Sequence, residues 1–151
     1  MITIDQIKKL REETAISLSE CKKALEETGG DSQKAKEILK KWGKDLSNKK
    51  IGRGAEQGII ASYIHSNKKI GVLLELSCES DFVAKNEDFQ NLAHEICLQI
   101  AAIYNSSDDK DSLLEQTWIK DSAKTIKDLI NESIAKLGEN IIVKKFIRYE
   151  I

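Results

Sequence analysis

The apolar residues of the first 42 positions recur at the spacing of amphipathic helices. They fall into three groups separated by short polar stretches, so three short helices are predicted, the second from Leu18 to about Thr28. The apolar residues at helical spacing are Ile4, Ile7 and Leu10 on one face of the first helix, Leu18, Cys21, Ala24 and Leu25 in the second, and Ala35, Ile38, Leu39 and Trp42 in the third.

Capping signals mark the ends of these helices. Thr3 and Gln6, and likewise Ser17 and Glu20, have the capping-box spacing that supplies acceptors for the free amides at a helix start. The stretch "TGGD" supplies a glycine after the second helix and places Asp31 at the N-cap of the third. Helices this short bury little apolar surface, so residues 1–42 are predicted to be a small recognition module rather than an active-site scaffold.

The pattern changes between Gly43 and Gly58. The stretch "GKDLSNKKIGRGAEQG" has four glycines, several basic residues and no apolar periodicity, so residues 43–57 are predicted to be a linker or an exposed basic arm. After it the period becomes two, which is typical of strands. Two strands, "GIIASYIHS" and "KIGVLLELS", are predicted, with a hairpin turn at Ser66 and Asn67.

Two further helical patterns and a third strand, "NIIVKKFIRYEI", complete the chain. A polar loop at residues 105–112 separates the helices, and Gly138 ends the second one. Residues 58–151 are therefore predicted to be an α+β core, with two helices over a three-stranded antiparallel sheet. The apolar face of one helix is formed by Phe89, Leu92, Ala93, Ile96, Cys97, Ile100 and Tyr104, and that of the other by Ile126, Leu129, Ile130, Ile134 and Leu137.

Composition places the chain among folded globular proteins. Of its 151 residues, 40% are hydrophobic and 32% are charged, and no apolar run approaches the ~20 residues of a membrane span. The start, "MITIDQIKKL", lacks the apolar region of a secretory signal and is too acidic for a typical transit peptide. We expect a protein that acts where it is made, or a mature form, and no membrane partner.

The three cysteines, Cys21, Cys78 and Cys97, are an odd number at wide spacing. This argues against a disulfide scaffold and for a reducing compartment. Their spacing to one another and to His65 and His94 does not match a metal site, so buried thiols are the favoured interpretation and no metal is expected.

Charge and motifs argue against nucleic-acid binding and against catalysis. Residues 1–54 carry a net charge of +4 and residues 55–151 one of −5, an excess too small to predict a nucleic-acid partner. The chain has no GxSxG, no phosphate-binding glycine loop and no HExxH motif. His65 and His94 are expected at surface or boundary positions. We therefore expect neither an enzyme nor a cofactor.

The stretch "ELSCESDFVAKNEDF", Glu75 to Phe89, places a large aromatic residue in a strand-to-helix connection. In one interpretation Ser80 caps a short helical turn, Asp81 is favoured by the helix dipole, and Phe82 fills the core, as most phenylalanines do. In the other interpretation Phe82 is exposed and is offered to a partner. The residue pattern alone favours the first.

The chain resembles the elongation factor Ts family, the guanine-nucleotide exchange factors of elongation factor Tu, over nearly all of its length. "LREETAISLSECKKALEETGGD" is similar to the ubiquitin-associated-like N-terminal module of that family. "GIIASYIHSNKKIGVLLELSCESDFVAKNEDFQNLAHEI" resembles its core signature, which is centred on a T-D-F-V-A motif, and "IAKLGENIIVKKFIRYE" is similar to its closing helix and strand.

Three departures from the family pattern stand out. Ser80 takes the place of the usual threonine, which also caps a helix. "TAISLSE" replaces the more usual T-G-A-G-M-M-D, so Leu18 and Ser19 occupy the methionine positions. Only a short polar loop lies between Tyr104 and Leu113, where longer members carry further helices or a second half-core.

The resemblance implies a partner and a site. It implies binding to elongation factor Tu, in the GDP-bound and nucleotide-free forms, and GDP release through disturbance of the Mg²⁺ and phosphate site. Phe82 would be the wedge and Asp81 an orienting hydrogen-bond partner. The matching core positions are Ser80, Asp81, Phe82 and Val83, and the positions expected to bind the partner in the N-terminal module are Leu10, Arg11, Leu18 and Ser19.

The resemblance also bears on assembly, because members with a single half-core pair two chains. Strict alternation along the last strand puts Val143, Ile147, Tyr149 and Ile151 on one face, and Ile142 and Phe146 on the other. Apolar residues on both faces of so small a sheet are hard to bury within one chain. We therefore expect a homodimer through the sheet, without a disulfide, and two copies of elongation factor Tu in the full complex. The alternative is a monomer whose exposed face is covered by elongation factor Tu.

Two other functions remain open at the level of sequence. One is a ubiquitin-associated-like adaptor or binding protein without exchange activity, and the other is a small enzyme with Cys78 or Cys97 as nucleophile. The expected location is the bacterial cytoplasm, or the interior of an organelle with bacterial-type translation such as a plastid.

Overall fold

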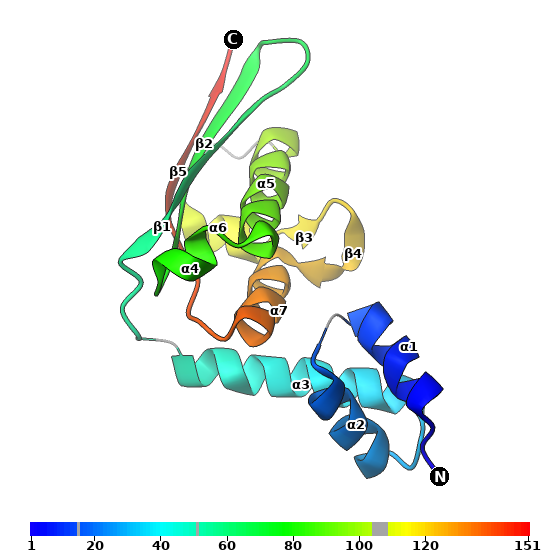
Figure 1. Cartoon of the computed structure of the whole chain (residues 1–151). Coiled ribbons are helices and arrows are strands. Elements are labelled where there is room, and N and C mark those ends of the chain that lie inside the picture. The colour runs from blue at the N-terminus through cyan, green and yellow to red at the C-terminus, as the bar shows by residue number, and fades with distance from the viewer. Residues whose placement is uncertain (15, 51, 104–108) are drawn as a thin grey trace.

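The computed structural model describes residues 1–14, 16–50, 52–103 and 109–151. Three helices are followed by a three-stranded antiparallel sheet with further helices, so the predicted α+β class is confirmed (Figure 1). In chain order the elements are α1 (Ile4–Thr14), α2 (Leu18–Glu27), α3 (Ser32–Lys50), β1 (Gln57–Ile64), β2 (Ile70–Cys78), α4 (Asp81–Ala84), α5 (Glu87–Ala102), α6 (Lys110–Glu115), β3 (Thr117–Trp118), β4 (Asp121–Thr125), α7 (Ile126–Leu137) and β5 (Ile142–Glu150).

Helices α1, α2 and the start of α3 enclose a small apolar core of their own. Their caps are those predicted. The amide of Thr3 donates to Oε1 of Gln6 over 2.9 Å, and the amide of Gln6 donates to Oγ1 of Thr3 over 3.2 Å. Asp31 accepts the amides of Gln33 and Lys34 at the start of α3. The buried residues of this core are Leu10, Cys21, Ala24, Leu25, Ala35 and Leu39.

Helix α3 is longer than predicted. It continues through Gly43 to Lys50, so the prediction of a linker from residue 43 onward is wrong for its first part. The sequence predicts a helix end at Trp42, because residues 44–50 have no apolar periodicity. Helix α3 packs against α7, and a methyl group on Gly43 would lie 3.4 Å from Cβ of Ala135. This packing offsets the roughly 1 kcal/mol that glycine costs inside a helix.

The sheet has the strand order β1-β2-β5, and each neighbouring pair is antiparallel. The β1–β2 hairpin turns at Ser66 and Asn67, as predicted, and the amide of Lys68 donates to the carbonyl of His65 over 2.8 Å. Helix α5 lies on the inner face of β1 and β2, and α7 packs beside α5 (Figure 1).

A bulge in β5 changes which of its residues share a face. The register with β2 shifts at Lys144, which pairs with no residue of β2. Val143 and Phe146 are consequently both buried, whereas Ile147 is exposed on the outer face. The predicted grouping of Val143 with Ile147, and of Ile142 with Phe146, is therefore wrong, because strict alternation fails at the bulge.

Three elements between α5 and α7 differ from the sequence-based prediction, namely α6, β3 and β4. The polar loop expected at residues 105–112 is in part the helix α6, and β3 and β4 form a small hairpin. Residues 104–108, which include the tyrosine predicted for the end of α5, lie outside the described residues. The buried side chain of Gln99 on α5 holds the hairpin, since Nε2 donates to the carbonyl of Thr117 over 3.0 Å and Oε1 accepts the amide of Ile119 over 2.9 Å.

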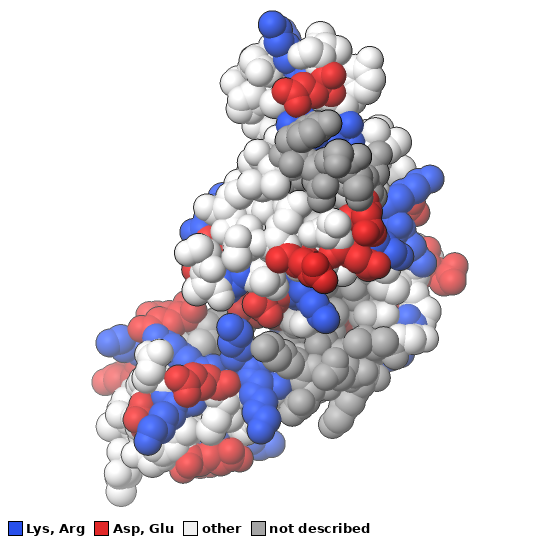
Figure 2. Space-filling view, turned by 180° about the vertical axis from the view of Figure 1, so that it is seen from behind, with Lys and Arg blue, Asp and Glu red and all other residues white. Residues whose placement is uncertain are grey.

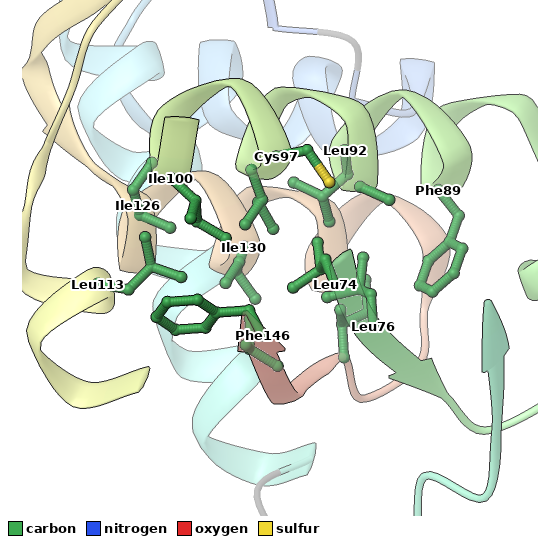
Figure 3. Close-up of a cluster of buried hydrophobic side chains, with 14 of the residues drawn as sticks. Leu74, Leu76, Phe89, Leu92, Cys97, Ile100, Leu113, Ile126, Ile130 and Phe146 are labelled. Atoms are coloured by element: carbon green, nitrogen blue, oxygen red, sulfur yellow. The ribbon is translucent and has the colours of Figure 1, made fainter. Parts of the chain in front are cut away.

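The larger apolar core lies between α5, α7 and the inner face of the sheet (Figure 3). Side chains from α5 point toward those of the sheet strands in this view. The three cysteines are buried and unpaired, as predicted. Within the described residues, no helix combines the length and apolarity needed to cross a membrane. The largest fully buried side chains of this core include Leu74, Leu76, Phe89, Ile96, Leu113 and Ile126.

Candidate functional site

The segment after β2 forms a single helical turn, α4. Ser80 is its N-cap, and Oγ of Ser80 accepts the amide of Val83 over 3.3 Å. Asp81 lies in the first turn, where the helix dipole favours a negative charge. Its carboxylate forms a 2.8 Å ion pair with Lys85, and this hydrogen bond raises the pKa of Lys85. Ser80 and Asp81 therefore occupy the predicted N-cap and first-turn positions.

Phe82 projects from this turn into solvent. Its exposed fraction is 90%, whereas the two following residues turn inward: Val83 packs against the core and Ala84 is buried. The interpretation in which Phe82 fills the core of its own chain is therefore wrong. Burying a phenylalanine typically contributes about 1.5–3 kcal/mol, and the free chain does not gain this energy from Phe82. The side chain is available to a partner.

The carboxylate of Glu139, in the connection from α7 to β5, holds the base of the turn. Oε1 accepts the amide of Glu79 over 3.1 Å and that of Ser80 over 2.9 Å, and Oε2 accepts the hydroxyl of Ser80 over 2.6 Å. These amides lie just beyond Cys78, the last residue of β2, so the sheet no longer provides their acceptors.

Glu79 forms the reciprocal contact. Its Oε2 accepts the amide of Asn140 over 2.7 Å, and its Oε1 pairs with Nε of Arg53 at 2.7 Å. Nδ2 of the buried Asn140 donates to the carbonyl of Arg53 over 3.0 Å. The segment before β1, the end of β2 and the start of β5 are thereby joined at the base of α4. Sequence reasoning missed these residues, because contacts between positions about 60 residues apart leave no period in the chain.

The thiol of Cys78 lies behind the same turn and donates to the carbonyl of Ser80 over 3.1 Å. Burial, and secondarily the charge of Glu139, raise the pKa of Cys78. Burial also raises the pKa of Cys97 to about 11. Nucleophilic cysteines need an accessible thiolate, so both thiols have the character of structural residues and not of catalytic ones.

The four residues singled out in the N-terminal module divide into two groups. Arg11, Leu18 and Ser19 are exposed, and Ser17 caps α2 by accepting the amide of Glu20. Leu10 is only 1% exposed and lies in the core of the module, so its expected contact with a partner is not supported by its position. Figure 1 places α1 and α2 apart from α4, with α3 and α7 between them. The exposed residues predicted in the N-terminal module and the residues predicted in α4 therefore lie on separate surfaces.

Charged side chains of both signs are interspersed on the face shown in Figure 2. Where Lys and Arg cluster on this face, Asp and Glu lie among them. This distribution is typical of a solvated protein surface, and it differs from the concentrated basic face that nucleic-acid binding requires.

The family model and the relatives that match this chain all belong to the same family. The family model for elongation factor TS matches residues 79–151. The chain is 40% identical to elongation factor Ts of Thermoanaerobacter sp. (strain X514), with 99% of this chain and 95% of that protein covered. It is 42% identical to elongation factor Ts of Coprothermobacter proteolyticus, with 99% and 98% covered, and 44% identical to that of Thermotoga petrophila, with 99% and 96% covered.

Proposed function

The chain belongs to the elongation factor Ts family of translation elongation factors, and from this premise we propose that it binds elongation factor Tu and promotes the release of GDP. The observation that carries the proposal is the exposure of Phe82, at 90%, on a turn whose base is hydrogen-bonded on several sides. A side chain held in this way can insert into a partner without first leaving its own core.

The proposed mechanism is mechanical and needs no reacting group. Mg²⁺ requires near-octahedral coordination at ~2.0–2.1 Å, so small movements of the elements that carry its ligands weaken it. Insertion of Phe82 between such elements of elongation factor Tu would move them, since packed elements shift between discrete positions. Asp81 would orient the contact by hydrogen bonding and would not itself bind the ion. Ser80 and Val83 hold the turn.

Binding of the nucleotide and binding of this protein to elongation factor Tu are thermodynamically linked. If this protein weakens the binding of GDP, then GDP or GTP weakens the binding of this protein by the same factor. Incoming GTP would therefore displace the factor and make it available again. In this scheme the protein is an exchange factor and not an enzyme in the usual sense, and it requires no cofactor.

The N-terminal module is proposed to add affinity through Arg11, Leu18 and Ser19. These residues are exposed and stand apart from the turn that carries Phe82. Leu10 would act indirectly, because it holds α1 in the module core. The alternative function, a ubiquitin-associated-like adaptor, would explain only the N-terminal module. The match to a relative covers 99% of the chain and so favours a function that uses the core as well.

The outer face of the sheet supports the proposal of a homodimer. Leu73 of β2 pairs directly with Ile147 of β5, and both side chains are exposed. Ile60, Ile64 and Tyr149 extend this exposed apolar face. Monomers rarely expose large contiguous apolar patches, so a second copy of the chain is the proposed cover, with elongation factor Tu itself as the alternative. Two copies of elongation factor Tu would then join the full complex.

The bacterial relatives support the proposal that the protein acts in the bacterial cytoplasm, with the interior of an organelle that has bacterial-type translation, such as a plastid, as the alternative. The test of the proposed function is the rate of labelled-GDP release from elongation factor Tu at increasing concentrations of this protein. We expect the rate to rise and saturate. An unchanged rate in the presence of a demonstrated complex would overturn the proposal.

A further inference from the structure

We propose that Glu139 and Glu79 are positioning residues, which set the direction of Phe82 through a reciprocal clamp between two strand ends. The inference rests on the proposed function, since it assigns the residues that hold the proposed wedge. Neither residue touches the partner in this scheme. Their role is to fix the backbone from which Asp81 and Phe82 project.

The clamp joins two stretches that have left the sheet. Glu79 follows the end of β2, and Glu139 and Asn140 precede the start of β5. The carboxylate of Glu139 takes the amides of Glu79 and Ser80, and the carboxylate of Glu79 takes the amide of Asn140. Each side thus provides a charged acceptor for the free amides of the other. Hydrogen bonds to a charged acceptor are roughly twice as strong as neutral ones.

The clamp acts on Phe82 through Ser80. The amide and the hydroxyl of Ser80 both donate to Glu139, and its carbonyl accepts the thiol of Cys78 and the amide of Ala84. The same hydroxyl oxygen caps α4 by accepting the amide of Val83. The N-cap is therefore fixed in position and in rotamer before the helical turn begins. Since α4 has only four residues, the orientation of its cap determines where Phe82 points.

Arg53 extends the clamp toward the N-terminal module. Its side chain pairs with Glu79, and its carbonyl accepts the side-chain amide of Asn140. Arg53 lies shortly after Lys50, the last residue of α3. The chain that leaves the module is thus attached to the base of the turn.

The test compares Glu139→Ala and Glu139→Gln with a matched control, Glu132→Gln, in the full chain. Glu132 lies on α7 and pairs with Lys124 at 3.0 Å, and among the described residues it has no hydrogen bond or ion pair with the turn. Two quantities are measured: the hydrogen exchange of the Glu79 and Ser80 amides in the free protein, and GDP release from elongation factor Tu as a function of factor concentration.

We expect Glu139→Ala to lose amide protection and to lower the maximal release rate about tenfold or more, because small misplacements of a positioned group have large effects on rate. The half-saturating concentration should change less than about threefold, since the surfaces of the N-terminal module are unaltered. Glu139→Gln keeps an acceptor for the amides and should fall between Glu139→Ala and the wild type. Glu132→Gln should behave as the wild type does.

Retained amide protection in Glu139→Ala, or lost protection with an unchanged maximal rate, would overturn the proposal. Thermal melting identifies a variant that does not fold, and Glu139→Gln then provides the comparison. If the wild type itself does not accelerate GDP release, the proposed function fails, while amide exchange still decides whether Glu139 orders the turn.

Discussion

The carboxylate of Glu139 accepts hydrogen bonds from both the amide and the hydroxyl of Ser80, 59 residues earlier in the chain. Two positions after this anchored serine, Phe82 is 90% exposed. An immobilised base and a solvent-exposed tip thus lie within three residues of each other. This combination distinguishes Phe82 from an aromatic residue on a loose loop, whose ordering would cost free energy on binding.

We predict that Phe82→Ala lowers the rate of GDP release while leaving the fold intact. Because the side chain is exposed, the loss of unfolding free energy should be well below the ~3–5 kcal/mol of a core phenylalanine. Urea unfolding and labelled-GDP release measure the two effects. Phe89→Ala is the matched control, since Phe89 is 0% exposed and should show the full core cost. Equal losses of stability and exchange in Phe82→Ala would favour a core role.

Removal of the N-terminal module should weaken binding more than it lowers the maximal rate. A chain that begins at Gly58 is expected to bind elongation factor Tu weakly and still release GDP at high concentration. A chain that begins at Gly52 keeps the pair between Arg53 and Glu79 and should have the higher maximal rate. Titrations of GDP release give both quantities, and circular dichroism checks the fold. Complete inactivity of folded truncated chains would contradict the prediction.

The free protein should sediment as a dimer at micromolar concentration. Leu73→Lys places a charge opposite Ile147 on the outer face of the sheet and should shift the equilibrium to monomer, because the charge would lose its hydration at the interface. Ile4→Lys is the control, since Ile4 is also exposed, at 71% against 53% for Leu73, but lies in the N-terminal module. Sedimentation equilibrium decides the question: a wild-type monomer mass that persists at high micromolar concentration rules the homodimer out.

Stability should fall at alkaline pH through Cys97. Burial raises the pKa of this thiol from 9.0 to about 11, so the unfolded chain loses the proton at a lower pH than the folded chain does. The contribution is therefore fully present below pH 9 and is lost as the pH rises toward 11. The contribution of the Cys97 thiol is measured by comparing the unfolding free energies of the wild type and Cys97→Ala from pH 8 to pH 11. The difference between the two proteins should shrink over this interval, and a constant difference would argue against the shift.

Alkylation should leave exchange activity unchanged. The three thiols are buried, and burial raises the pKa of each, so iodoacetamide should react slowly with the folded chain and readily after unfolding. GDP release before and after treatment of the folded protein measures the effect. Rapid modification together with loss of activity would revive the hypothesis of a cysteine nucleophile.

The parts of the fold that could be predicted from the sequence are those with a local pattern. The periodicity of Ile126, Ile130 and Ile134 and the glycine at residue 138 predicted α7 with its end, and the alternating residues predicted β1 and β2. The parts that could not be predicted depend on distant contacts. Helix α3 continues where it packs against α7, and the β3–β4 hairpin depends on Gln99.

In the candidate site, too, the features with a local sequence signal could be predicted and those that depend on distant contacts could not. Ser80 and Asp81 could be assigned to a helix start from residue type alone, and the structure confirms both positions. The exposure of Phe82 could not be decided from the pattern, because a phenylalanine between an acidic residue and Val83 fits a buried or an exposed position. The contacts of Glu79 and Glu139 had no local signal, since the carboxylate of each meets amides about 60 residues away.

Helix α3 contributes to two apolar units at once. Ala35 and Leu39 belong to the core of the N-terminal module, and Gly43 lies against Ala135 of α7. Melting the module would remove the neighbour of α7, and melting the larger core would leave one side of α3 in water. The two units therefore share part of their free energy of unfolding, so heat or denaturant should unfold the chain in one cooperative transition although the sequence divides into two patterns.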